Sequence, residues 1–226
     1  MAADEDVPGW FGKISTLGDF AHRRLPPAWL KACDAWLSQA LRTSHARLGD
    51  RWLDVYLTTP MQRFAWAPGV IDERWWYGLF MPSCDSVGRY FPLVIAQSRD
   101  VVPQDREGLA QLERWYEHLG VAAMRTLDER GTPVEALEET LREAPAWTGA
   151  ALRDGDAAMI RPGRLPLPSP AVLAQWLPAL AASALVDSVA GCSLWWSVDS
   201  HDAPASVRVV RGLPWDEDFV ELLEGR

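Results

Sequence analysis

The spacing of apolar positions along the chain predicts a fold that mixes short strands with amphipathic helices. Residues 9–14 combine aromatic and β-branched side chains and are flanked by Pro and Gly, as expected of a first strand. Behind the Leu-Pro-Pro sequence that follows, apolar side chains recur every three to four residues, which predicts a long helix ending at Gly49. The positions that define its apolar face are Trp29, Cys33, Trp36 and Ala40.

The middle of the chain changes from a strand pattern to a helix pattern. Between Trp52 and Ser98, short apolar runs are separated by Pro and Gly, and we expect two to four strands of an antiparallel meander. The runs are residues 55–57, 63–66, 77–81 and 91–96. Helical spacing returns after Pro103, and a shorter acidic helix is predicted over residues 134–142.

The last third of the chain begins with a Pro- and Gly-rich stretch, residues 144–169, which is predicted to be loop. A Ser-Pro pair has the chemistry of a helix start, and the helix predicted behind it should be kinked at Pro178. Residues 193–198 and 206–210 are β-branched or aromatic runs joined by a polar link, which indicates a hairpin. A final helical turn or two is expected after Pro214.

Together these elements predict an α/β fold of the α+β type, in which about three main helices pack on a central, mainly antiparallel sheet. We interpret residues 1–8 as an acidic leader and residues 9–226 as a single domain. Within it, residues 9–100 hold the first strands and the first helix, residues 101–190 form a helical region with the loop, and residues 191–226 form the hairpin with a short helix.

Charge and cysteine usage exclude several function classes. The net charge of −9 disfavours binding to nucleic acid and to anionic lipid headgroups. The start of the chain is acidic where a signal peptide would be basic, and no stretch makes a good membrane span. The three cysteines are isolated, without metal-ligand spacing, so we expect reduced thiols, no metal and no other cofactor. We therefore expect a cytoplasmic protein.

Thirteen tryptophans are many for a chain of 226 residues. Neighbouring side chains on a strand point to opposite faces of a sheet, so in the pair Trp195-Trp196 one indole should face the core. The other should meet a covering helix, a partner or water. The same argument applies to Trp75-Trp76, and with Trp215 these are the positions where we expect an unburied indole.

Four short motifs stand out before residue 100. The first runs from Gly9-Trp-Phe-Gly-Lys13 through Gly18-Asp-Phe20 to the Arg-Leu-Pro entry of the first helix. The others are residues 50–60, Arg63-Phe with Ala67-Pro-Gly69, and residues 78–92. In this order and at this spacing, the motifs resemble the opening of the TagF (ImpM-like) family of proteins associated with bacterial type VI secretion.

The resemblance implies a soluble fold related to longin-like modules and a role as a post-translational repressor of type VI secretion. In several members of the family, repression works through a cytoplasmic forkhead-associated scaffold protein, which is the partner that the resemblance implies here. Some lineages fuse this domain to a protein phosphatase. The sequence has no acidic metal-binding cluster of that kind, so we expect a regulator that is not an enzyme.

Charged and glycine residues within the motifs are candidates for a recognition surface or for staples that hold loops together. Asp19 can accept hydrogen bonds from its own loop or pair with Arg23 or Arg24, and Asp85 can pair with Arg89. The glycines around the first strand indicate close backbone approach or positive φ. Lys13 lacks the spacing of a phosphate-binding loop. The candidate interaction residues are Lys13, Gly18, Asp19, Phe20, Arg23, Arg24, Asp85, Arg89, Trp75 and Trp196.

Two other function classes stay open at this stage. A hydrolase would combine Ser15 or Ser83 as nucleophile with His22 and with Asp19 or Asp85, although no Gly-x-Ser-x-Gly sequence is present. A structural accessory subunit of the secretion apparatus is the third class. It is disfavoured because the sequence has no long coiled coil and no basic or apolar assembly tail.

Overall fold

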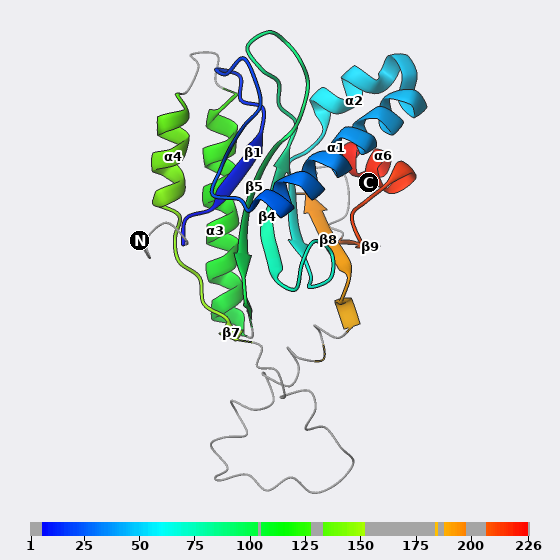
Figure 1. Cartoon of the computed structure of the whole chain (residues 1–226). Coiled ribbons are helices and arrows are strands. Elements are labelled where there is room, and N and C mark those ends of the chain that lie inside the picture. The colour runs from blue at the N-terminus through cyan, green and yellow to red at the C-terminus, as the bar shows by residue number, and fades with distance from the viewer. Residues whose placement is uncertain are drawn as a thin grey trace, which may run out of the picture.

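The computed structural model has a seven-stranded antiparallel sheet with helices on both of its faces (Figure 1). The structure describes residues 6–103, 105–127, 133–151, 184, 188–197 and 207–225. The antiparallel sheet with its covering helices confirms the predicted fold class. The helix predicted behind Ser169 and most of the loop predicted before it lie outside the described residues.

The strands of the main sheet come from both ends of the chain. They are β1 Gly9–Gly12, β2 Ala21–Arg23, β3 Gln62–Trp66, β4 Trp75–Met81, β5 Leu93–Arg99, β8 Cys192–Ser197 and β9 Arg208–Arg211. Their order across the sheet is β2-β1-β5-β4-β3-β8-β9, with antiparallel pairing throughout. The predicted meander is confirmed as β3-β4-β5, and the predicted hairpin is confirmed as β8 and β9.

The helices lie in two layers. On one face lie α1 Pro27–Leu48, α2 Trp52–Thr58 and α6 Asp216–Leu223, and on the other lie α3 Arg106–Arg125 and α4 Val134–Arg142 (Figure 1). The long first helix is confirmed, and Gly49 follows it with a positive φ of 53°. A short turn of 3-10 helix, Gly49–Arg51, joins it to α2.

Two segments differ from the expected secondary structure. Residues 55–57 were predicted as a strand, but they belong to α2, where Trp52 and Tyr56 lie one turn apart and stack with ring centroids at 4.9 Å. A short apolar run has no length to separate helix from strand, so packing decides. Ala150–Ala151, inside the predicted loop, forms β7 and pairs with β6, Val101–Val102.

The sheet separates two apolar cores, one on each face. Trp195 lies in the core under α1 and α6, whereas Trp196 packs against the core under α3, as strand alternation predicts. Trp75 and Trp76 also face opposite cores, but both are buried, and Trp75 is only 4% exposed. The expectation of an unburied indole at Trp75 is therefore wrong, because β4 is central and helices cover both of its faces.

Candidate functional site

The family motifs meet at one end of the sheet. The loop between β1 and β2 (residues 13–20) and the loop between β4 and β5 (residues 82–92) lie together at the upper end of the view in Figure 1. The amide of Ser86 donates to the carbonyl of Leu17 at 2.9 Å. Arg89 Nη2 donates to the carbonyl of Gly18. We call the surface formed by these two loops the motif-loop surface.

A buried ion pair joins the two loops. Lys13 Nζ lies 2.8 Å from Asp85 Oδ2, and both side chains are removed from solvent. Arg89 Nε donates to the same oxygen at 2.6 Å, which confirms the predicted pair of Asp85 with Arg89. Asp85 Oδ1 accepts from the amides of Val87 and Arg89. The carboxylate therefore connects β1 to the second loop and also closes the turn within that loop.

These bonds decide the protonation state of Asp85. Burial by itself would raise the pKa of this carboxyl group, because it disfavours the charged form. The hydrogen bonds from Lys13, from the Arg89 amide and side chain, and from the Val87 amide outweigh burial and hold the pKa well below its usual range. Asp85 therefore stays ionised at neutral pH and keeps the two loops joined.

A second set of bonds fixes the loops from below. Ser83 Oγ donates to the carbonyl of Lys13 at 2.8 Å. The Tyr56 hydroxyl of α2 donates to the carbonyl of Ser83 at 2.9 Å and accepts from the Ser83 amide. Gly12, with φ of 132°, has no room for a side chain, because a Cβ would lie 2.0 Å from the carbonyl oxygen of Pro92. The predicted close approach is thus confirmed at Gly12.

Apolar side chains project from this fixed base. Phe20 is 47% exposed although its ring packs edge-on against Phe91, with centroids at 4.7 Å. Lys13 Nζ lies 4.9 Å from the centroid of the Phe20 ring on the inner side. Val87 is 70% exposed at the tip of the second loop, and Tyr90 is partly exposed beside α2. Exposed aromatic groups on a rigid base are typical of protein interfaces.

The other candidate residues lie elsewhere or have local roles. Asp19 accepts from the amide of Phe20, so it caps its own loop rather than pairing with Arg23 or Arg24. Arg24 pairs with Glu138 of α4, and Arg23 lies beside the Trp10 ring at 5.9 Å. Trp75 is in the core, and Trp196 is partly buried, with its ring edge-on to Tyr116 at 5.3 Å.

Val87 and Tyr90 of the surface were absent from the sequence-based candidates. They stand within the fourth motif, and their exposure depends on the folded loop, in which Asp85 accepts from the amides of Val87 and Arg89. The convergence of the two loops also had no local signal, since Lys13 and Asp85 are separated by 72 residues.

The residues considered for hydrolysis are not brought together. Ser15 Oγ donates to the carbonyl of Thr126, and Ser83 Oγ donates to the carbonyl of Lys13. His22 is exposed on β2 and lies opposite Phe11 in the pairing with β1. In the described parts of the chain, no group of three or more His, Cys, Asp or Glu side chains is placed to hold a metal ion. Within the same residues, no helix is both long and apolar enough to cross a membrane.

Comparison with known proteins agrees with the motifs. Residues 9–144, which carry both loops and α1 to α4, match the TagF N-terminal domain, described as type VI secretion system-associated. The crystal structure of PA0076 from Pseudomonas aeruginosa PAO1 is similar, with a TM-score of 0.72 and 33% sequence identity over 97% of this chain and 94% of that chain. No protein with a curated description matches. The chain belongs to the TagF family of type VI secretion system-associated proteins.

Proposed function

We propose that the chain represses bacterial type VI secretion after translation, by binding another protein in the cytoplasm, without chemistry of its own. Its partner in this proposal is a forkhead-associated scaffold protein of the secretion system. Family membership supports the link to secretion. The observation that carries the proposal is that the family motifs build a fixed base beneath exposed apolar side chains.

The motif-loop surface has the physical properties that a contact site needs. Binding costs entropy when loops must become ordered, and here the Asp85 bonds hold both loops before a partner arrives. Phe20 and Val87 supply apolar area that loses contact with water in a complex. Arg89 keeps a largely exposed side chain beside them and offers further hydrogen-bond donors.

Effector release tests the role in secretion. Effector release should rise when the gene is deleted and fall when the protein is in excess, because more repressor occupies a larger fraction of its partner. Unchanged release in both strains would exclude a regulatory role. The measurement is quantitative secretion of one effector, normalised to its cellular level.

Surface variants test the mode of action. Val87→Glu places a charge at the tip of the motif-loop surface and should abolish capture of the scaffold protein and raise effector release to the level of the deletion strain. Leu109→Glu is the matched control, because Leu109 is also an exposed apolar residue, 57% against 70% for Val87, and lies on α3 in the other helix layer. Equal scaffold binding by both variants would place the contact elsewhere.

Two outcomes would favour the alternative functions. Hydrolysis of generic esters or phosphoesters that is lost in His22→Ala would favour the hydrolase. A structural accessory subunit would be favoured if the protein co-purified with the assembled apparatus in fixed stoichiometry. Effector release would then not change with the amount of the protein.

A further inference from the structure

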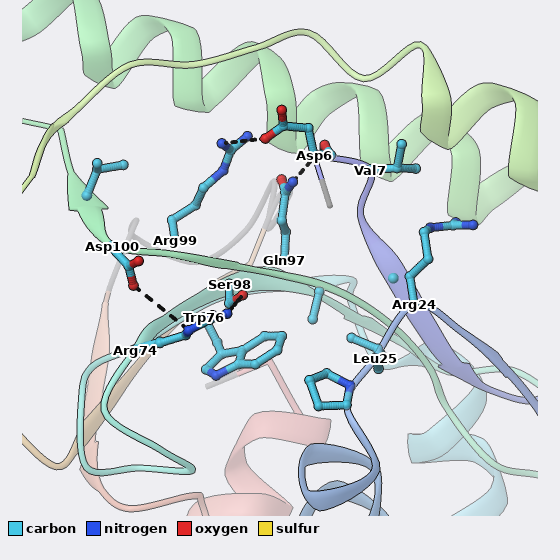
Figure 2. A pocket seen from close by; sticks show the side chains of 14 residues that line it. Asp6, Val7, Arg24, Leu25, Arg74, Trp76, Gln97, Ser98, Arg99 and Asp100 are labelled. Atoms are coloured by element: carbon cyan, nitrogen blue, oxygen red, sulfur yellow. Dashed lines mark hydrogen bonds and ion pairs between the residues drawn. The ribbon is translucent and has the colours of Figure 1, made fainter. Parts of the chain in front are cut away.

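A polar cavity of about 660 Å³ lies at the other end of β5, away from the motif-loop surface. Its walls are residues 6–9, the link between β2 and α1, the start of β4 and the end of β5 (Figure 2). The volume is within the range of small-molecule sites, roughly 300–1,000 Å³. Leu25 and Pro26 of the link form an apolar wall, and most of the other lining groups are polar.

Two buried polar atoms at this cavity have no hydrogen-bond partner among the residues that the structure describes. Gln97 is 4% exposed, and its Nε2 donates to the carbonyl of Asp6 at 2.7 Å, but its Oε1 accepts no hydrogen bond. The Nε of Arg99 is likewise buried and without an acceptor. Positions 97 and 99 lie on the same face of β5, and Figure 2 shows both side chains directed toward Asp6. Both residues line the cavity, so a buried acceptor and a buried donor without partners lie in its wall.

The Arg99 guanidinium lies 5.5 Å from the centroid of the Trp147 ring, and its carboxylate partner is Asp6. Arg99 Nη1 lies 3.4 Å from Asp6 Oδ1, at the long end of a hydrogen bond, and the Asp6 side chain is 79% exposed. Arg24, which also lines the cavity, is occupied by Glu138 and by the carbonyl of Pro8. Arg74, the third lining guanidinium, is more exposed and bonds to Ser98. Among the three, Arg99 is the one with a buried donor that lacks an acceptor in the described residues.

These groups define the chemistry of a ligand. An acceptor with negative charge would satisfy Arg99, and a donor on the next atom would satisfy Gln97 Oε1. We propose that the cavity binds a carboxylate with an N–H or O–H group on the adjacent carbon, with the carboxylate on Arg99 and the donor on Gln97. Such a group occurs in free hydroxy acids and at the C-terminus of a peptide.

Titration calorimetry of the full chain with four probes tests the proposal. The probes are acetate, glycolate, acetylglycine and inorganic phosphate. Glycolate or acetylglycine should bind about tenfold more tightly than acetate, since acetate lacks the adjacent donor. Tighter binding of glycolate would indicate a free hydroxy acid, and tighter binding of acetylglycine would indicate a peptide C-terminus.

Two variants assign the contacts. Gln97→Met should remove the preference for glycolate or acetylglycine over acetate. Arg99→Lys keeps the charge but loses the Nε donor, so it should lower the affinity for the preferred probe about tenfold. Arg114→Lys is the control and should bind like the wild type, because Arg114 lies on the exposed side of α3 and pairs with Glu107. If Gln97→Met does not fold, the four-probe series and Arg99→Lys still decide.

Three results would overturn the proposal. The first is that no probe shows saturable binding at millimolar concentration. The second is that acetate, glycolate and acetylglycine all bind with the same affinity. The third is that phosphate binds most tightly of the four. The ¹⁵N–¹H signal of Arg99 Nε gives a direct readout, since it should shift on binding of the preferred probe. The site is separate from the motif-loop surface, so Val87→Glu should leave this binding unchanged.

Discussion

At the scale of single residues, Gly78 sets the spacing in the centre of the sheet. A Cβ at this position would lie 2.1 Å from the carbonyl oxygen of Ile95 and 2.5 Å from the ring of Phe64. Gly78→Ala should therefore lower the free energy of unfolding by about 3 kcal/mol, the upper end of overpacking costs. Urea unfolding measures the change.

Gly88 provides the control for Gly78. It has φ of 80°, but no atom of the described residues lies within 4 Å of a Cβ built there, so Gly88→Ala meets backbone strain and no clash with them. Its cost should be about 1 kcal/mol. Equal losses in the two variants would contradict the role of close packing at Gly78.

Asp85 should determine part of the acid sensitivity of the fold. Its pKa is lowered in the native state, so its ionised form stabilises the protein above the unfolded-state pKa of about 4. That contribution is lost as pH falls below this value toward the lower native pKa. Asp85→Asn should flatten the decline of unfolding free energy in this range, measured by urea unfolding at several pH values. Asp19→Asn, at an exposed aspartate, should keep the wild-type slope, and identical slopes in both variants would exclude Asp85 as the source.

At the scale of elements, one carboxylate of α4 makes side-chain bonds to β1 and to the link after β2, in addition to the core contacts of Leu137 and Leu141. Glu138 accepts hydrogen bonds from Trp10 Nε1 of β1 at 2.6 Å and from Arg24 after β2. Glu138→Ala leaves Arg24 without its buried partner and should lower the free energy of unfolding by about 3 kcal/mol. Hydrogen exchange should increase in α4 more than in α1, because the lost bonds hold α4 and do not involve α1.

Glu139 is the matched control on the same helix. It is exposed, so Glu139→Ala should change the free energy of unfolding by less than about 0.5 kcal/mol. Uniform exchange in α1 and α4 after Glu138→Ala would show that the bond stabilises the whole molecule rather than one element.

Elements with local signals were predictable, and elements that depend on distant partners were not. The apolar stripe before Gly49 identified α1, and the two β-branched runs identified β8 and β9. α2 is not predictable in this way, because its apolar run is short and one of the bonds that fix it, from Tyr56 to Ser83, comes from a distant loop. The same limit applies to the site, since the pair of Asp85 with Arg89 is local, whereas its bond to Lys13 requires the folded sheet.

At the scale of the whole molecule, the end of the chain completes the core that the beginning starts. β8 pairs with β3 and places Trp195 beside Trp36, with ring centroids at 5.7 Å. Trp36 Nε1 donates to the carbonyl of Pro214, which leads into α6. These contacts join residues inside the region matched to the TagF N-terminal domain, residues 9–144, to residues after it. Residues after the matched region therefore complete the core in which Trp36 lies.

Phe219 of α6 tests this dependence with a single change. Its ring lies edge-on to Trp36 at 5.9 Å and to Phe80 of β4 at 6.1 Å, and it is fully buried. Phe219→Ala should lower the free energy of unfolding by about 4 kcal/mol, a large part of the total for a typical domain. Val209→Ala, at an exposed position of β9, should cost far less.

Removal of residues 191–226 should abolish the native fold, because β3 would become an edge strand and the core around Trp36 would lose Trp195 and Phe219. Near-UV circular dichroism of the shortened chain should show no fixed aromatic environment. A native near-UV spectrum would mean that the first part of the chain forms its core alone. In that case β8, β9 and α6 would be an addition to a finished domain, and Phe219→Ala should then release only those elements.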